Sequence, residues 1–235
     1  MSFREEELVA KRRKKQAWMS DAAVQPAIVA HISKKITSNQ KRIIDALGEE
    51  PFAVYSFLSS ECARGGVDKN PLFQFVYRSY YRLDNAGLTS DFKSRYFKLM
   101  ERARVSGTID LRMIATDLHR YKTLRKHKSL QFSFVTKLAA TVSPGYPIYD
   151  RAVGKALGFS PPAGGKNFAQ GLDRYLQFYE WLGGLYTTLL AGSTLPAVVN
   201  ALEAQYPLAA TLPPIKALDL LFWSAGKLKI VAVDQ

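Results

Sequence analysis

A lysine and an aspartate stand in a segment of this sequence that is otherwise largely apolar. The segment SFVTKLAATVSPGYPIYDRAV, residues 133–153, carries Lys137 in its first half and Asp150 thirteen residues later, after the turn sequence Pro-Gly-Tyr-Pro. A lysine amine is a nucleophile in covalent catalysis, but only in its neutral form. Whether the surroundings of Lys137 favour that form therefore bears on whether the chain is an enzyme or a binding module.

The helices expected on either side of the turn would place these two side chains. The turn cannot continue a helix, so a helix that begins near Lys137 should end by Val142 or Ser143. Asp150 then opens a helix over residues 151–157 as its N-cap, with the carboxylate against unpaired backbone N–H groups. Lys137, at the opening of the preceding helix, would lie near the positive end of the helix dipole, which disfavours its ammonium. A tight turn between the two helices could bring both side chains into one crevice.

Helical periodicity recurs along the rest of the chain, whereas the alternation typical of strands is scarce. Apolar and aromatic residues three or four positions apart predict helices at 39–47, 51–81, 91–103, 109–118, 168–182, 194–207 and 213–226. Gly65 and Gly66 interrupt the second of these, and Gly226 is expected to close the last. The pattern predicts an all-α protein.

The net charge of +13 is unevenly distributed along the chain. Residues 64–151 hold seventeen Lys and Arg against seven Asp and Glu, whereas residues 152–235 hold six against five. A strongly basic half indicates a surface that faces a polyanion, and nucleic acid is the partner that this charge favours. Arg125, Lys126 and Lys128 are candidates for contact with phosphates. Residues 1–36, with the run KRRKK, form a predicted basic arm or helix ahead of a helical domain over residues 37–235.

The aromatic segment FVYRSYYRLD allows two interpretations. Its tyrosines could stack on nucleobases while Arg78 and Arg82 contact phosphates. Phe73, Tyr77 and Tyr81 recur at every fourth residue, however, and this spacing is more typical of a stripe packed in a core. We therefore expect the stripe to be buried.

Composition disfavours several classes of protein. No window contains eighteen uninterrupted apolar residues, so no membrane span is expected, and the N-terminal segment lacks the order of a secretory signal. The single cysteine, Cys62, excludes an internal disulfide framework and is typical of a reducing cytoplasm, where we expect the protein to reside. Three histidines and one cysteine do not make a persuasive metal site, so none is predicted.

The lysine–turn–aspartate segment resembles the helix–hairpin–helix DNA glycosylase superfamily. The resemblance covers Leu130–Val153 and consists of a lysine, a short helix and the motif P-I-Y-D-x-x-V, in which Arg151 and Val153 match the positions after the aspartate. It is most similar to the bifunctional branch that removes oxidised purines such as 8-oxoguanine. The resemblance implies that Lys137 attacks the sugar C1′ of a flipped nucleotide and forms a Schiff base, and that Asp150 assists this attack.

The same resemblance implies a helical bundle with two lobes and a cleft between them, which binds DNA and excises a damaged base without a cofactor. Further DNA contacts would come from Ser133, Thr136 and Arg151. Tyr149, Phe222 and Trp223 would be candidates for a pocket that holds the flipped base.

The family's phosphate-binding hairpin is not matched in full, which leaves alternatives open. That hairpin usually carries Gly-x-Gly, whereas QFSFVTK has no glycine from Gln131 to Lys137. The difference favours, as an alternative, a non-catalytic DNA- or RNA-binding protein on the same scaffold, for instance in phage defence or genome maintenance. A helical protein-interaction domain, whose partners the sequence does not name, is the third interpretation. The segments FQFVYRSYYRLDNAGLT and KSLQFSF…PIYD also resemble bacterial proteins of unassigned function.

Overall fold

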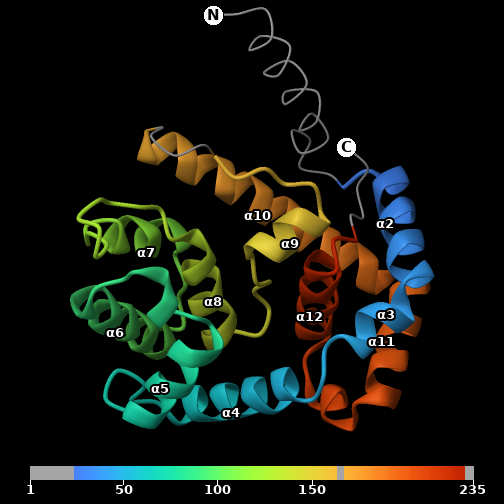
Figure 1. The fold of residues 1–235 in the computed structure, drawn as a ribbon, viewed down its shortest axis with the longest axis horizontal. Helices are drawn as coiled ribbons and strands as arrows, with labels where there is room; N and C mark the ends of the chain where they lie inside the picture. Colours follow the sequence, from blue (N-terminus) through green and yellow to red (C-terminus); the bar gives the residue numbers. More distant parts are fainter. Residues whose placement is uncertain (1–23, 163–166, 231–235) are drawn as a thin grey trace, which may run out of the picture.

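The computed structural model describes residues 24–162 and 167–230, which form a helical protein (Figure 1). Within these two ranges there is no β-strand, and one isolated antiparallel bridge joins Leu88 to Thr123. The prediction of an all-α protein is confirmed for this part of the chain. Most of the predicted basic arm, residues 1–23, lies outside the described residues.

The helices follow one another along the chain. Their bounds are α2 Pro26–Ser38, α3 Gln40–Asp45, α4 Glu50–Arg64, α5 Pro71–Tyr80, α6 Ser90–Ser106, α7 Leu111–Leu118, α8 Phe132–Val142, α9 Arg151–Ala156, α10 Phe168–Ala191, α11 Thr194–Gln205 and α12 Pro214–Lys227. Two 3₁₀ turns, η2 Asp84–Ala86 and η3 Pro207–Thr211, lie between them.

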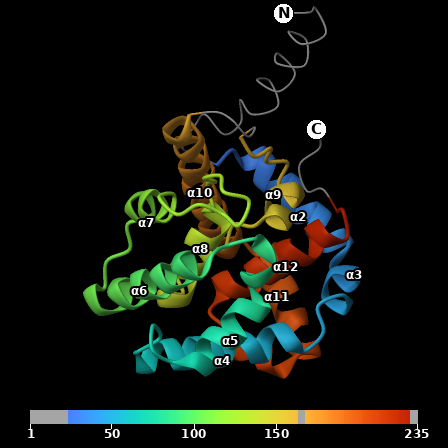
Figure 2. The ribbon, with the colours of Figure 1, turned by 60° about the vertical axis from the view of Figure 1, so that its left-hand side comes forward.

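The helices pack in two groups (Figures 1 and 2). Helices α5, α6, α7 and α8 lie on the left of Figure 1, whereas α2, α3, α11 and α12 lie to their right, with α9 against α12. Helix α4 contacts α5 and α8 in the first group and η3 in the second. Helix α10 likewise contacts α7 in the first group and α2, α11 and α12 in the second. These two helices therefore connect the groups.

The aromatic stripe of α5 packs in the core, as its spacing predicted. Phe73 and Tyr77 are fully buried and Tyr81 nearly so. The Tyr77 hydroxyl lies 2.7 Å from the Tyr96 hydroxyl of α6, and Tyr96 donates to the carbonyl oxygen of Phe134 in α8 at 2.7 Å. A buried phenol requires such a partner, so this chain of hydrogen bonds fixes α8 relative to α5 and α6.

The boundary expected between residues 36 and 37 falls inside α2. Ile32 and Ile36 of this helix are fully buried, and α2 contacts α10 and α11. Residues 26–36 therefore belong to the folded domain, because α2 buries its apolar side in the second group of helices.

The prediction that Gly226 closes the last helix is wrong. Helix α12 continues to Lys227, and Gly226 is buried in its last turn. The glycine lies against α9, where the absence of a side chain allows the two helices to approach closely.

Candidate functional site

A cleft of about 1210 Å³ lies between the two groups of helices. Residues of α4, α5, α8, α9 and α12 line it. Lys137 lines the cleft from α8, and Asp150 lines it from the residue before α9. The tertiary structure thus brings the amine and the carboxylate of the lysine–turn–aspartate segment to the same cleft.

Lys137 lies in the middle of α8, not at its opening as the sequence predicted. The helix begins at Phe132 because Phe132, Phe134 and Val135 bury their side chains and extend the apolar face toward the N-terminus. The Nζ of Lys137 lies 5.3 Å from the ring centroid of Phe134 and 5.4 Å from that of Tyr81. Both distances are in the range of cation–π contacts, so the end of the side chain lies against two rings.

The pKa of the Lys137 amine is below its ordinary value of 10.5. Burial is the main cause, because it penalises the ammonium, and the negative charge of Asp150 acts in the opposite direction. The direction agrees with the sequence prediction, but the physical cause is burial and not a helix dipole. A lowered pKa increases the fraction of neutral amine, the form that can act as a nucleophile.

Asp150 caps α9, as predicted. Its Oδ1 accepts hydrogen bonds from the backbone N–H groups of Ala152, at 2.8 Å, and Val153, at 2.9 Å. Because one oxygen makes both bonds, Oδ2 is not used by the cap. The cap fixes the carboxylate at the N-terminus of α9, facing the cleft.

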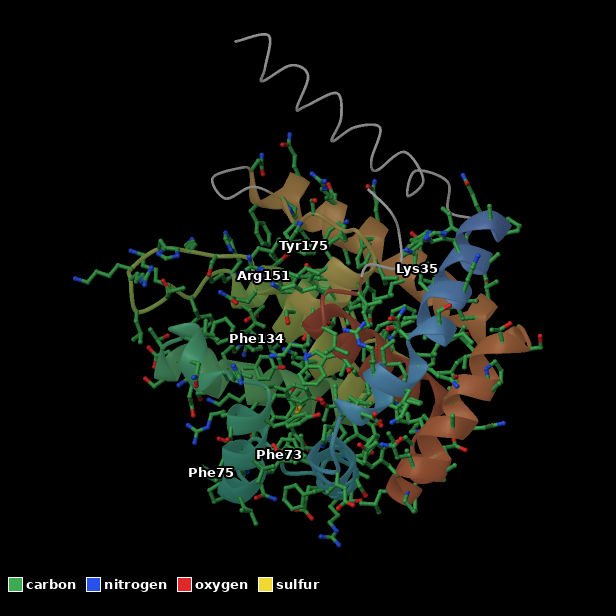
Figure 3. The ribbon with its side chains drawn as sticks, turned by 45° about the vertical axis from the view of Figure 1, so that its right-hand side comes forward. Lys35, Phe73, Phe75, Phe134, Arg151 and Tyr175 are labelled. Atoms are coloured by element: carbon green, nitrogen blue, oxygen red, sulfur yellow. The ribbon has the colours of Figure 1, made fainter. Side chains whose placement is uncertain are left out.

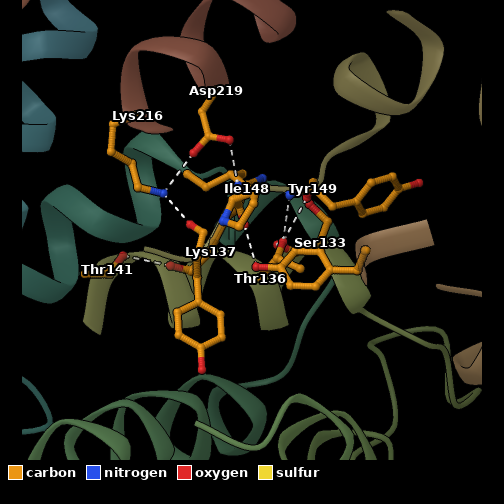
Figure 4. Close-up of polar contacts among 11 residues, drawn as sticks. Ser133, Thr136, Lys137, Thr141, Ile148, Tyr149, Lys216 and Asp219 are labelled. Atoms are coloured by element: carbon orange, nitrogen blue, oxygen red, sulfur yellow. Dashed lines mark hydrogen bonds and ion pairs between the residues drawn. The ribbon is translucent and has the colours of Figure 1, made fainter. Parts of the chain in front are cut away.

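The connection between α8 and α9 is held on one side by Thr136 (Figure 4). Its hydroxyl donates to the carbonyl oxygens of Ser133 and Tyr149 and accepts from the N–H of Tyr149, at 3.0 to 3.1 Å. Thr136 is fully buried. The prediction that it contacts nucleic acid is therefore wrong, and its role is to fix the residue before Asp150.

Lys216 and Asp219 of α12 hold the same connection on its other side, and sequence analysis missed both. They form a buried ion pair that lines the cleft (Figure 4). The available signal was a lysine and an aspartate three residues apart in the apolar segment PIKALDLLFW, since buried charges need a partner.

Two of the three residues predicted for a base pocket are core residues. Tyr149 packs against Phe159 and Phe178, and Phe222 stacks on Tyr186 with ring centroids 5.4 Å apart. Both are buried and neither lines the cleft. Each ring buries a large apolar area, which stabilises its position in the core more than exposure in a cleft would. Trp223, the third, does line the cleft, and Lys227 lies over its ring.

The residues predicted to contact nucleic acid separate into two places. Ser133 and Arg151 line the cleft. Arg125, Lys126 and Lys128 are exposed in the loop between α7 and α8 and do not line it. The cleft and this loop are therefore two distinct basic surfaces.

The lining of the cleft combines cations with aromatic rings. The cations are Arg82, Lys137, Arg151, Lys155, Lys216, Lys227 and Lys229, and the anions are Glu50, Asp150 and Asp219. Tyr55, Phe75, Tyr80, Tyr81, Phe134 and Trp223 supply the rings, of which Phe75 is strongly exposed (Figure 3). Positive charge beside aromatic faces suits a strand of nucleic acid.

Comparisons with protein families, curated proteins and solved structures gave no match to this chain. In the described ranges no His, Cys, Asp and Glu side chains form a group of three or more suited to a metal ion. No single helix there is long and apolar enough to cross a membrane. Helices α10 and α11, which meet at a bend of 82°, are long and apolar enough only when taken together.

Proposed function

We propose that this protein is a DNA glycosylase-like base-excision enzyme of the helix–hairpin–helix type, with Lys137 as nucleophile and Asp150 as assisting carboxylate. One observation carries the proposal: the amine of Lys137, with a pKa lowered by burial, and the carboxylate of Asp150 line one cleft that also presents cations and aromatic rings. DNA is the substrate that this lining suits best.

The proposed reaction uses Lys137 on a nucleotide flipped into the cleft. The neutral amine attacks the sugar C1′, and the bond between C1′ and the base breaks, so that the electron pair leaves with the base and a proton from solvent neutralises it. The attached nitrogen then loses a proton, and its lone pair forms the C1′=N bond of the Schiff base as the C1′–O4′ bond of the sugar ring breaks. The electron pair of that bond stays on O4′, which takes up a proton. Asp150 stabilises positive charge that develops on the sugar ring.

Borohydride trapping tests this function. The protein is incubated with duplex DNA that carries 8-oxoguanine or an abasic site, and borohydride reduces any Schiff base to a stable adduct that denaturing gels resolve. We expect an adduct with the natural protein and none with Lys137→Gln. Lys155→Gln, which removes another lysine from the same cleft, is the matched control and should still give the adduct. Absence of an adduct from natural protein that binds this DNA would contradict the proposal.

A non-catalytic nucleic-acid-binding protein is the second candidate. The observation that favours it is the position of the Lys137 Nζ over two aromatic rings, since cation–π contacts stabilise the charged form of an amine. Such a protein would retard DNA on native gels with a steep dependence on salt and would give no adduct. A protein-interaction domain would show neither behaviour.

A further inference from the structure

The ion pair in α12 contacts the segment just before Asp150. The Nζ of Lys216 lies 2.8 Å from Oδ2 of Asp219 and donates a hydrogen bond to the carbonyl oxygen of Tyr146. The Oδ1 of Asp219 accepts from the N–H of Ile148 at 2.8 Å. The two charged side chains thus hold two backbone groups of the α8–α9 connection, and Asp150 follows Ile148 by two residues.

Both members of this pair are removed from solvent. The side chains of Lys216 and Asp219 are 2% and 5% exposed. Replacing a buried ion pair by apolar side chains of similar volume is often neutral or stabilising, so stability alone does not explain such a pair. The hydrogen bonds of the pair with Tyr146 and Ile148 indicate that it orders this stretch of backbone.

We propose that the Lys216–Asp219 pair is a positioning element for Asp150, which holds the α8–α9 connection so that the Asp150 carboxylate stays within electrostatic reach of the Lys137 amine. The inference rests on the proposed function, because the position of Asp150 matters to the reaction only if it assists at Lys137. Thr136 fixes the same connection from α8, so the segment is held from both sides.

Several ionisable groups surround the pair or share its cleft. The phenols that feel the charge of Asp219 are Tyr55 of α4, Tyr80 and Tyr81 beside α5's end, and Tyr179 and Tyr186 of α10. Burial raises the pKa of each, so they stay neutral at neutral pH. Glu50 and the exposed cations Arg82, Arg151, Lys155, Lys227 and Lys229 share the cleft. These cleft residues are the same in every variant, so a difference between two Lys137 titration profiles reports on the substitution itself.

The test measures the pKa of Lys137 by trace acetylation with acetic anhydride between about pH 7 and 11, with the Lys137 peptide quantified by mass spectrometry. The variant is Lys216→Met/Asp219→Asn, which removes one charge of each sign and so leaves the net charge unchanged. If Asp150 moves away, the pKa of Lys137 falls, and its acetylation at pH 8 rises by roughly threefold or more. Asp150→Asn calibrates the effect and should raise acetylation at least as much.

A matched control is the ion pair of Arg95 and Asp117, which joins α6 and α7 away from the cleft at 2.7 Å. Arg95→Met/Asp117→Asn should leave the Lys137 profile unchanged. A folded Lys216→Met/Asp219→Asn variant with an unchanged profile would overturn the inference. If that variant does not fold by circular dichroism, Lys216→Met/Asp219→Leu carries the same test with an apolar pair.

Borohydride trapping with the same proteins separates this inference from the proposed function. Absence of an adduct from the natural protein would refute the lysine chemistry, yet the acetylation profile would still show whether the pair positions Asp150. If the natural protein gives an adduct, the double variant should form it more slowly. The single variant Asp219→Glu should keep part of the rate, because it keeps the negative charge. A rate equal to that of the natural protein would overturn the inference.

Discussion

Gly226 of α12 lies directly against the backbone of Ala152 in α9. A β-carbon at position 226 would stand 2.0 Å from the carbonyl oxygen of Ala152, far inside van der Waals contact. Asp150 caps the same short helix, so the distance between α12 and α9 helps to set where its carboxylate lies.

Gly226→Ala should destabilise the protein by about 3 kcal/mol, the upper part of the range for overpacking, because the new methyl group meets backbone and not a flexible side chain. Denaturant unfolding measures the change. Gly183→Ala in α10 is the control, since nothing lies within 4 Å of a β-carbon there. It should stabilise by about 0.5 to 1 kcal/mol through helix propensity, and equal effects at the two sites would contradict the packing argument.

Substitutions of Asp150 should separate its role as a cap from its role in chemistry. Asn is as good an N-cap as Asp, so Asp150→Asn should change the free energy of unfolding by only a few tenths of a kcal/mol, whereas Asp150→Ala should cost about 1 kcal/mol. Both should slow adduct formation in the trapping assay. An Asp150→Asn protein that reacts at the natural rate would show that the carboxylate acts only as a cap.

The two basic surfaces should contribute unequally to DNA binding. Arg151→Gln/Lys155→Gln removes two cations of the cleft, and it should reduce the slope of log affinity against log salt by about 2 if both contact phosphates. Arg125→Gln/Lys128→Gln removes an arginine and a lysine from the exposed loop, and we expect a smaller change in slope. Fluorescence anisotropy over a salt series measures both, and a larger effect from the loop would place the DNA outside the cleft.

Glu101 should contribute stability that is lost in acid. Its hydrogen bonds with Arg104, together with backbone N–H groups of Gly66 and Val67, lower the pKa of this carboxyl to about 2 against the partial burial that raises it. Because the folded pKa lies below the unfolded value, the stabilisation is complete above about pH 4.5 and is lost as the pH falls through 2. Glu101→Gln should therefore unfold more easily than the natural protein at pH 6, by about 1 to 2 kcal/mol, and the difference should shrink toward pH 2.

Much of the local structure was predictable from neighbouring residues. Aromatic residues at every fourth position identified the buried stripe of α5, because one face of a helix repeats at that interval. The cap at Asp150 was predictable too, since its partners are the N–H groups two and three residues ahead. The start of α8 was not predictable in the same way. The prediction placed it near Lys137, whereas the buried side chains of Phe132 and Phe134 extend the helix five residues toward its N-terminus.

The sequence by itself determined the helical class, the turn between α8 and α9, and the presence of an amine and a carboxylate on either side of that turn. Only the tertiary structure decided that burial lowers the pKa of Lys137 and that Tyr149 and Phe222 pack in the core. It also decided that Lys216 and Asp219 hold the connection between α8 and α9. Helix periodicity and caps depend on residues within one or two turns, whereas burial and electrostatics depend on which distant helices meet, and no local pattern specifies that.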